Sequence, residues 1–559
     1  MRQGTRHTSQ AAIALAVVIG SLLSASSALG AWSAATQVKG FSGASNVVVG
    51  IDPDGTQQLG LLATIGPAGQ GIYNLTRAPG ATDWTAKLIS GPTINRGRVA
   101  LARNGAGVAT WQGADQSVWA AYRPAGQAWG APTELNNPPK LGLGPIPVIS
   151  AKGQAAVVWS RKTALDKREP DQIVYSSTTT ASWPTTPTLL AAVELPQPVD
   201  GSNFNTCLPG SGLVASILPD GTPIAAWNDA YGSFKEEVTD LVPPIQSGHN
   251  ELGLCGVKVA TPGNTVEVTP RPAVGWNAAG SGSLPFWYPI SIDVDPDTGR
   301  TALVVRGNDD AVTESNAACD FPGIQESDYC FDNAAFQTRV SLGGGTGVTH
   351  PGTLTAANVR VDLRDGVVAV ATRGPTALAA GVGLSFPSLA TLTTDAPLNS
   401  SAIAVGPKGE AQFIVHTAGN LKTFAAPTGG VFAASNDIAT SEAGVDLAIG
   451  CNGDALAAWN RGSNGVFAAV NLTGTPQCEG SGPGGEEPNP PGGNPTTPGG
   501  STPGPSGGGS AGSSGGGSAP VSPPPTAPKP LKCKKGFTKK KVGGKQKCVK
   551  KAAKGKKKR

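Results

Sequence analysis

The sequence has few of the side chains that usually build catalytic or metal centres. It contains four histidines, one methionine and eight cysteines, and no two cysteines stand in a Cys-x-x-Cys spacing. None of His249, His350 and His416 lies in a His-Glu-x-x-His spacing. No Gly-x-Ser-x-Gly elbow, P-loop or dinucleotide fingerprint occurs between a predicted strand and a predicted helix. The common zinc, dithiol and nucleotide motifs therefore give no guide to function, although a serine triad can be assembled from distant residues.

Long hydrophobic runs are also scarce. The first thirty residues combine Arg2 and Arg6, the apolar run AAIALAVVIGSLL and the small-residue exit SSALG, the layout of a secretory signal peptide cleaved after Gly30. No later segment approaches the roughly 20 continuous apolar residues of a membrane helix. We therefore expect residues 1–30 to be a signal peptide. The mature chain is expected to be soluble, secreted and extracellular, in the medium or at the cell wall.

The cysteine count is even, which in a secreted chain favours disulfides over metal thiolates. Many pairings are possible, and proximity along the chain is the only guide to them. Pairing neighbours predicts four bridges: Cys207 with Cys255, Cys319 with Cys330, Cys451 with Cys478, and Cys533 with Cys548.

Charge and composition divide the mature chain into three regions. Residues 531–559 hold fifteen of the 43 Lys and Arg residues and no acid, whereas residues 31–530 hold 26 bases against 38 acids. The body is thus acidic and the tail strongly basic, so the two attract different partners. Residues 479–530 are rich in Gly, Pro and Ser, without an apolar pattern to bury, which predicts a disordered linker. This linker separates a large domain, residues 31–478, from the Lys-rich tail.

The tail is predicted to form a small disulfide hairpin with Gly543-Gly544 at its turn. Its lysines would bind an anionic cell-wall polymer or a membrane surface by charge. Phe537 is its single aromatic residue, so base stacking is not expected, nor is sequence-specific nucleic-acid binding. A solubilising tail without a partner is the alternative. The candidate anion-binding residues are Lys532, Lys534, Lys535, Lys539, Lys540, Lys541, Lys545, Lys547, Lys550 and Lys551.

A repeated unit runs through the large domain. NGAGVATWQGADQSVWAAYR (104–123) aligns without a gap with NGDALAAWNRGSNGVFAAVN (452–471). Two shorter copies, KGQAAVVW and DGTPIAAW, end at Trp159 and Trp227, and all four place tryptophan six residues after a glycine. Weaker copies that lack the tryptophan contain Gly55, Gly299, Gly366 and Gly409.

One unit is predicted to form four strands. Apolar residues alternate before and after the glycine, as in VVVGIDPDG, which indicates two half-buried strands joined by a tight turn. Glycine supplies the positive φ that such a turn requires. A third strand follows, and a loop tryptophan at Trp84, Trp129 or Trp183 precedes a short fourth strand. Repeated four-stranded units predict an all-β fold, a β-propeller of seven or eight blades.

The aromatic residues divide into two groups. Trp111 and the other tryptophans of the repeat are expected to pack between blades, because a spacing that recurs with the fold serves the fold. Trp276, Trp287 and Tyr288 lie outside the pattern and are the candidates for a ligand-binding platform. Arg123, which ends the first copy, is expected to be exposed.

Residues 228–290 and 306–350 stretch the repeat with Gly-, Pro- and Asn-rich sequence. We interpret them as disulfide-stapled loops at one rim, where recognition residues often lie, with insertions of no particular role as an equal alternative.

Asp293, Asp295 and Asp297 alternate in DVDPDTG, as carboxylates around one calcium ion can. Glycine stands at the seventh position and glutamate is missing from the twelfth, so the spacing departs from that of a calcium loop. A hairpin turn is the preferred interpretation, and calcium is the one cofactor kept as an alternative.

These features together resemble a family of uncharacterised secreted β-propeller repeat proteins of high-GC Gram-positive bacteria, broadly of the sialidase-like propeller type. The resemblance rests on the Gly-to-Trp units, the Gly/Pro/Ser linker and the Cys/Lys-rich ending LKCKKGFTKKKVGGKQKCVKKAAKGKKKR, and it implies architecture only. The Ser-x-Asp-x-Gly-x-Thr-Trp boxes of sialidases are not reproduced, because here tryptophan follows glycine by six residues.

The leading hypothesis is a secreted or cell-surface binding module that recognises a glycan or protein and is attached to an anionic envelope surface by its tail. The first alternative is a secreted carbohydrate-active enzyme, a glycoside hydrolase or lyase, with its site at the propeller rim or channel. Paired carboxylates beside basic residues would favour that enzyme. The second alternative is a structural envelope protein, and no catalytic residue is assigned.

Overall fold

The computed structural model describes residues 31–91, 95–136, 141–164, 171–193, 212–235, 251–268, 282–283, 286–308, 311–312, 337–344, 347–354, 358–373, 378–385, 387–393, 401–417, 420–427, 429–440, 444–461, 464–473, 537–542 and 545–550. The predicted signal peptide and linker lie outside these residues, as do Cys207, Cys319, Cys330, Cys478 and Cys533. The chain forms two compact units, Met1–Gly485 and Glu486–Arg559.

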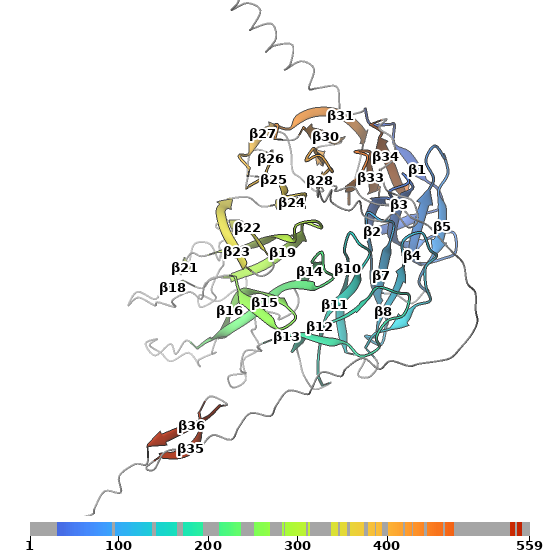
Figure 1. Cartoon of the computed structure of the whole chain (residues 1–559). Coiled ribbons are helices and arrows are strands. Elements are labelled where there is room, and N and C mark those ends of the chain that lie inside the picture. The colour runs from blue at the N-terminus through green and yellow to red at the C-terminus, as the bar shows by residue number, and fades with distance from the viewer. Residues whose placement is uncertain are drawn as a thin grey trace, which may run out of the picture. The chain divides into compact units, whose positions relative to one another are not determined.

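Unit 1 is an all-β propeller of eight antiparallel blades, with no α-helix among its described residues (Figure 1). Blade 1 consists of β2 (Ser42–Ile51), β3 (Gln57–Ile65), β4 (Gly71–Arg77) and β5 (Thr85–Leu88). Blade 2 consists of β6 (Asn95–Leu101), β7 (Gly107–Gln112), β8 (Val118–Arg123) and β9 (Thr133–Glu134). Blade 3 consists of β10 (Gly142–Ile149), β11 (Ala155–Arg161), β12 (Gln172–Thr178) and β13 (Thr188–Ala192).

The two longest strands of the propeller, β15 and β16, lie in the fourth blade. Blade 4 consists of β14 (Val214–Ile217), β15 (Pro223–Lys235), β16 (Glu251–Thr261) and β17 (Asn264–Glu267). Blade 5 consists of β19 (Phe286–Val294), β20 (Arg300–Asn308), β22 (Gln337–Gly344) and β23 (Gly347–Leu354). A separate two-stranded pair joins β18 (Gly282–Ser283) to β21 (Ala311–Val312).

The remaining blades complete the ring. Blade 6 consists of β24 (Asn358–Arg364), β25 (Val367–Arg373), β26 (Leu378–Gly383) and β27 (Ala390–Thr393). Blade 7 consists of β28 (Ser401–Val405), β29 (Ala411–Thr417), β30 (Asn420–Ala426) and β31 (Ala433–Thr440). Blade 8 consists of β32 (Asp446–Ile449), β33 (Ala455–Asn460), β34 (Val466–Asn471) and β1 (Thr36–Val38). The predicted all-β propeller is confirmed, and the number of blades is eight.

Blade 8 closes the ring because its outer strand comes from the start of the propeller. β1 pairs antiparallel with β34, and Thr36 lies opposite Ala468. The Thr36 hydroxyl also donates to Ala468 O, 432 positions away in the chain. Backbone pairing between the two ends of the propeller therefore fixes blade 8 to blade 1.

Each blade turns from its first to its second strand at a glycine in the left-handed region. Six of the turns share a four-residue form, in which Gly105 N–H, for example, donates to Ala102 O at 3.1 Å. A Cβ would be strained at this φ, and at Gly105 it would also lie 3.0 Å from Asp52 Cγ. The eight glycines, all predicted from the repeat, have φ between 72° and 86°: Gly55, Gly105, Gly153, Gly221, Gly299, Gly366, Gly409 and Gly453.

An apolar cluster fills each of the eight blade interfaces. Trp111 of blade 2 packs with Ile72 and Ile89 of blade 1. Its ring stacks on that of Trp119, with 6.4 Å between the ring centroids. The other motif tryptophans also face the preceding blade and are 0% exposed: Trp159, Trp227 and Trp459. The predicted packing of these tryptophans between blades is therefore confirmed.

The interpretation of residues 228–290 and 306–350 as loops is wrong in part. β15 and β16 run through the first range and pair residue by residue as far as Lys235 and Glu251. In the second range, β22 lies entirely within it, and β23 begins within it and extends beyond its end. The two strands pair with each other. The added sequence lengthens the hairpins of blades 4 and 5, because pairing satisfies the backbone N–H and C=O groups that a loop would leave to solvent.

In unit 2, the described residues form two strands. β35 (Phe537–Val542) pairs antiparallel with β36 (Lys545–Lys550), and Lys540 lies opposite Lys547. None of the described residues of the chain forms a helix with the length and apolarity that spanning a bilayer requires.

Replacing Trp111 by alanine should lower the free energy of unfolding by about 3–5 kcal/mol, because it leaves a cavity between blades 1 and 2. Chemical denaturation followed by circular dichroism measures this loss. Leu384→Ala is the control, since Leu384 is 76% exposed and its loss should change stability by less than about 0.5 kcal/mol. Equal effects of the two substitutions would contradict a role for Trp111 in blade packing.

Candidate functional site

The first strands of the eight blades form the innermost ring of the propeller. Each contacts the first strand of the next blade, from β2 and β6 round to β32 and β2. A cavity of about 140 Å³ lies among the first strands of blades 1, 2, 6, 7 and 8 and the turn after β6. We call it the channel pocket.

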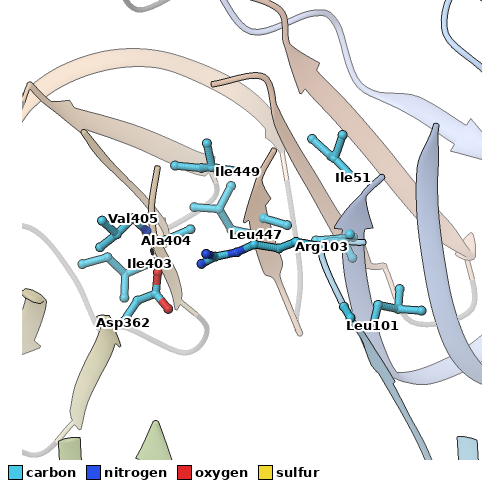
Figure 2. Close-up of a pocket in the computed structure, with 13 residues that line it drawn as sticks. Ile51, Leu101, Arg103, Asp362, Ile403, Ala404, Val405, Leu447 and Ile449 are labelled. Carbon is cyan, nitrogen blue, oxygen red and sulfur yellow. Dashed lines mark hydrogen bonds between the residues drawn. The ribbon is translucent and has the colours of Figure 1, made fainter. Parts of the chain in front are cut away.

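The channel pocket has aliphatic walls and two charged side chains. Figure 2 shows Arg103 extending from the turn after β6 toward Asp362 on β24. The apolar walls come from both sides of the pocket and include Ile51, Leu101, Ile403, Leu447 and Ile449. The exposed lining is polar as well as apolar, because backbone groups and the two charged side chains contribute to it beside the aliphatic side chains. Convergent polar groups within a concave site are a usual character of small-molecule sites.

Arg103 owes its place to a turn that the propeller repeats. It is the second residue of the turn Ala102–Gly105, in which Gly105 N–H donates to Ala102 O. The five other turns of this form carry proline, alanine or cysteine at the same place: Pro53, Ala151, Pro219, Pro407 and Cys451. Proline suits that position because its φ is preset, so the long cation is the exception and is not required by the turn.

A buried polar network braces this turn from behind. Arg123 donates to Gly105 O at 2.5 Å, to Gln58 Oε1 at 3.0 Å and to Asn74 Oδ1 at 3.1 Å. Trp129 Nε1–H donates to the same Asn74 oxygen. Arg123 is only 7% exposed, so the expectation that it lies on the surface is wrong. Its guanidinium is buried because carbonyl and amide oxygens of blades 1 and 2 accept its hydrogen bonds.

The Arg103 guanidinium, in contrast, has no hydrogen-bond or ion-pair partner in the described part of the chain. Its charge acts at longer range on Asp362 and Asp293, whose pKa values it lowers in part. A guanidinium that points into an apolar pocket without a partner is available to a ligand.

Three aspartates on first strands connect neighbouring blades. Each side chain is half-buried, and each carboxylate accepts a backbone N–H of the next blade. The bonds are Val49 N–H to Asp446 Oδ2 at 2.9 Å, Leu363 N–H to Asp293 Oδ2 at 2.9 Å, and Val405 N–H to Asp362 Oδ2 at 2.5 Å. These bonds hold blade 8 to blade 1, blade 5 to blade 6, and blade 6 to blade 7.

Burial raises the pKa of all three carboxyl groups. For Asp446 burial dominates and raises the pKa to about 6. For Asp293 burial and repulsion by Asp362 raise the pKa well above its usual range. Burial also raises the pKa of Asp362, although Arg103 and the hydrogen bond with Asp293 oppose this. The pair Asp293–Asp362 therefore retains a shared proton more readily than isolated carboxyl groups.

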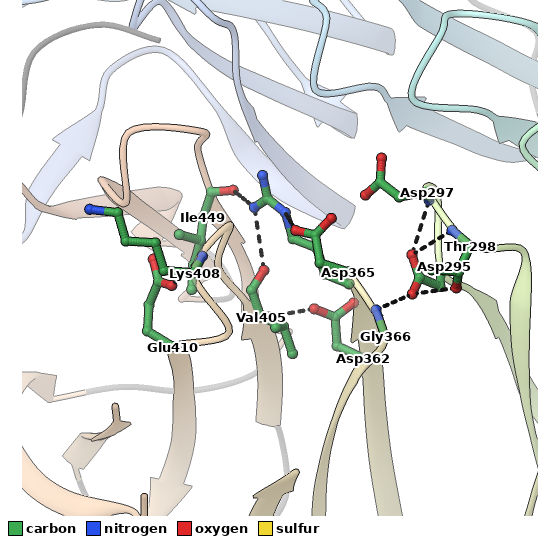
Figure 3. Close-up of polar contacts among 11 residues, drawn as sticks. Asp295, Asp297, Thr298, Asp362, Asp365, Gly366, Val405, Lys408, Glu410 and Ile449 are labelled. Carbon is green, nitrogen blue, oxygen red and sulfur yellow. Dashed lines mark hydrogen bonds and ion pairs between the residues drawn. The ribbon is translucent and has the colours of Figure 1, made fainter. Parts of the chain in front are cut away.

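Arg364 ties the neighbouring blades together at the same end of the ring. Its Nη1 donates to Ile449 O at 3.1 Å and to Val405 O at 3.4 Å, and its Nε lies 3.6 Å from Asp365 Oδ2 (Figure 3). Burial and the nearby Arg103 lower the pKa of Arg364 to about 10. Unlike Arg103, Arg364 is occupied by these protein partners.

The three aspartates of the predicted calcium site have different environments. Asp295 is buried and accepts N–H groups of Asp297, Thr298 and Gly366 (Figure 3). Burial acts to raise its pKa, but these bonds and the Thr298 hydroxyl outweigh it, so the pKa lies below its usual value. Burial and Asp365 raise the pKa of Asp297. No group of three His, Cys, Asp or Glu residues in the described part of the chain is arranged to hold a metal ion.

The other predicted site residues are described only in part. Trp276 lies outside the described residues, the side chain of Trp287 is not described, and Tyr288 is half-buried in β19. Cys451 is disulfide-bonded, but its predicted partner lies outside the described residues, and the side chains of Cys255 and Cys548 are not described. Six of the predicted tail lysines lie in β35 and β36: Lys539, Lys540, Lys541, Lys545, Lys547 and Lys550. Lys532, Lys534, Lys535 and Lys551 lie outside the described residues.

Arg103, Asp362 and Asp446 are missing from the residues predicted from sequence. A signal for the aspartates exists in a repeated tripeptide, an aspartate between two aliphatic residues just before the turn. It occurs as Ile292-Asp293-Val294, Val361-Asp362-Leu363 and Val445-Asp446-Leu447. Arg103 could have been found only by aligning the turns and noting where a cation replaces proline or alanine.

No family model matches the chain, and no curated protein is similar to it in sequence. Among solved structures, the Dos1 propeller is similar with a TM-score of 0.41 and 11% identity, over 81% of this chain and 96% of that one. A Hadza microbial sialidase is similar with a TM-score of 0.33 and 11% sequence identity, over 73% of this chain and 78% of the sialidase chain. A prolyl endopeptidase is similar with a TM-score of 0.35 and 10% sequence identity, over 76% of this chain. The match spans only 55% of the endopeptidase chain. At these TM-scores the likenesses carry no argument about function.

Asp446→Asn should reduce the loss of stability between about pH 4 and pH 7. The unfolded carboxyl has a pKa near 4. Because the folded pKa is higher, about 6, the contribution of Asp446 is full below pH 4 and is lost as pH rises through 6. The amide cannot ionise, so the variant should avoid a loss of up to about 2–3 kcal/mol.

Urea denaturation at several pH values measures this difference between the variant and the unchanged protein. Asp83→Asn, at an exposed aspartate of blade 1, is the control and should leave the pH profile unchanged. Parallel pH profiles for Asp446→Asn and the unchanged protein would contradict the raised pKa.

Proposed function

We propose that the protein is a secreted propeller binding module that takes a small polar ligand into the channel pocket. The observation that carries this proposal is the Arg103 guanidinium, which points into an aliphatic cavity and has no partner among the described residues. An anionic group of a ligand could form charge-assisted hydrogen bonds with this guanidinium.

The turn chemistry supports a role for Arg103 in binding rather than in folding. Ala151 occupies the same place in the turn of blade 3, and that turn keeps the same hydrogen bond, Gly153 N–H to Ser150 O at 2.9 Å. The fold therefore does not need an arginine at this position. The bracing network around Arg123 holds the turn rigidly, and a rigid scaffold lowers the entropy that binding costs.

A secreted carbohydrate-active enzyme is the second candidate. The observation in its favour is that the carboxyl groups of Asp293 and Asp362 interact with each other and with Arg103. However, Asp293 is not part of the pocket lining, so the two carboxyl groups do not flank the space that a substrate would occupy, as a glycoside hydrolase requires. Each also accepts a backbone N–H of the next blade. The pair is therefore better suited to connecting blades than to attacking a glycosidic bond.

The basic tail is proposed to hold the protein to an anionic cell-wall polymer or membrane surface. Register in β35–β36 places Lys540 of one strand opposite Lys547 of the other. Their mutual repulsion is relieved when anionic groups neutralise them. The platform of Trp276, Trp287 and Tyr288 stays a prediction for a glycan or protein ligand.

Arg103→Ala should abolish stabilisation by ligand while leaving the fold intact. Thermal unfolding of the full chain is measured with glycine, L-leucine, lactate, glucose and N-acetylglucosamine at millimolar concentrations. A bound ligand at a hundredfold excess over Kd stabilises by about 2.7 kcal/mol, so Tm should rise by a few degrees in the unchanged protein only. If no compound raises Tm, or if the variant responds equally, the proposed site is wrong.

Deleting residues 531–559 should release the protein from bacterial cells into the medium without unfolding the propeller. The tail carries fifteen positive charges and the rest of the mature chain is acidic, so cell association should depend on the tail and weaken with salt. Immunoblots of cell and medium fractions at low and high salt measure the distribution. Cell association that survives the deletion would contradict this role.

A further inference from the structure

If the channel pocket is the ligand site, as proposed above, we infer that its ligand carries both a carboxylate and an ammonium group on a short aliphatic frame, as a free aliphatic α-amino acid does. Arg103 would bind the carboxylate and Asp362 the ammonium. This inference rests on the proposed function and specifies the class of ligand.

The charges of the pocket favour a dipolar ligand over a simple ion. Arg103 and Asp362 are the two charged side chains of the lining, and they come from blades 2 and 6. A ligand with only negative charge would be repelled by Asp362. A ligand with only positive charge would meet Arg103. A zwitterion satisfies both walls, because each end faces a side chain of opposite charge.

The carboxyl pair is prepared for a cation. Asp362 Oδ2 is occupied by Val405 N–H, and the side chain also shares a hydrogen bond with Asp293. Two adjacent carboxyl groups need a positive charge between or beside them, which a shared proton otherwise supplies. An ammonium group of the ligand would take over that role, and the displaced proton would pass to solvent.

The walls and the size of the pocket limit the rest of the ligand. Apart from Arg103 and Asp362 the lining consists of Gly, Ala, Val, Leu and Ile residues. A short aliphatic group of a ligand can pack against these aliphatic side chains, which offer sugar hydroxyls no hydrogen-bond partner. The cavity of about 140 Å³ is smaller than the roughly 300–1,000 Å³ of sites for drug-sized ligands. A free amino acid with an aliphatic side chain fits both limits.

The test compares three compounds that share one aliphatic frame. L-leucine carries both charges, isocaproate lacks the ammonium group, and isopentylamine lacks the carboxylate. Isothermal titration calorimetry at neutral pH measures the affinity of each compound for the full chain. L-leucine should bind at least about tenfold more tightly than either single-charge compound, because each loses one charge-assisted contact.

Variants separate the two ends of the ligand. Arg103→Ala should weaken L-leucine by about 10- to 100-fold and leave isopentylamine no weaker. Asp362→Asn should weaken L-leucine to a similar degree and leave isocaproate no weaker. Lys152→Ala is the control, since this exposed lysine lies in the equivalent turn of blade 3, outside the pocket lining, and its loss should change no affinity.

The outcomes distinguish the class of ligand from the site itself. Isocaproate or isopentylamine could bind as tightly as L-leucine and depend on Arg103 or Asp362. The pocket would then be a ligand site, but the inference that its ligand carries both charges would be wrong. If L-leucine does not bind while glucose or lactate raises Tm through Arg103, the zwitterion is again wrong and the proposed function stands. If none of the tested compounds binds, both proposals are overturned.

Discussion

Packing of each blade against the blade before it is the interaction on which the rest of the molecule depends. The turn glycine sets the phase of the second strand, so the residue six positions later faces the preceding blade. In four blades this residue is tryptophan, and in others it is Leu61, Val305 or Val415 in the corresponding cluster. A slip of one residue would turn these side chains to the opposite face of the sheet. The first strands, and with them the channel, hold their positions because these interfaces are filled.

The channel pocket arises where the repeat departs from itself. Six turns share one four-residue form, and one of them carries a long cation, Arg103, where its five counterparts carry proline, alanine or cysteine. Among the described residues, aspartate bonds join blades 5 and 6, blades 6 and 7, and blades 8 and 1. A ring built from equivalent units thereby acquires one side with an arginine and another with a pair of carboxyl groups. This asymmetry would give the proposed ligand a single orientation.

Most of the fold could be predicted from the sequence, because turn glycines and alternating apolar residues repeat and each copy reinforces the others. The tryptophans could be assigned to blade interfaces for the same reason. Arg123 could not, because its burial depends on Gln58 and Asn74 of another blade, which have no fixed spacing from it. The channel pocket could not be predicted from the sequence either. Arg103 and Asp362 are brought together only by the curvature of the ring, whereas the candidates chosen from sequence were residues that stood out locally.

The closure of blade 8 by β1 also determines when the channel pocket can exist. Its walls come from blades 1, 2, 6, 7 and 8, so they include both ends of the propeller. Thr36 must find Ala468 before blade 8 is complete, and contacts so distant in the chain form late in folding. A truncated or partly translated chain could build several stacked blades and still have no pocket. Ligand binding would then report on the completeness of the whole propeller.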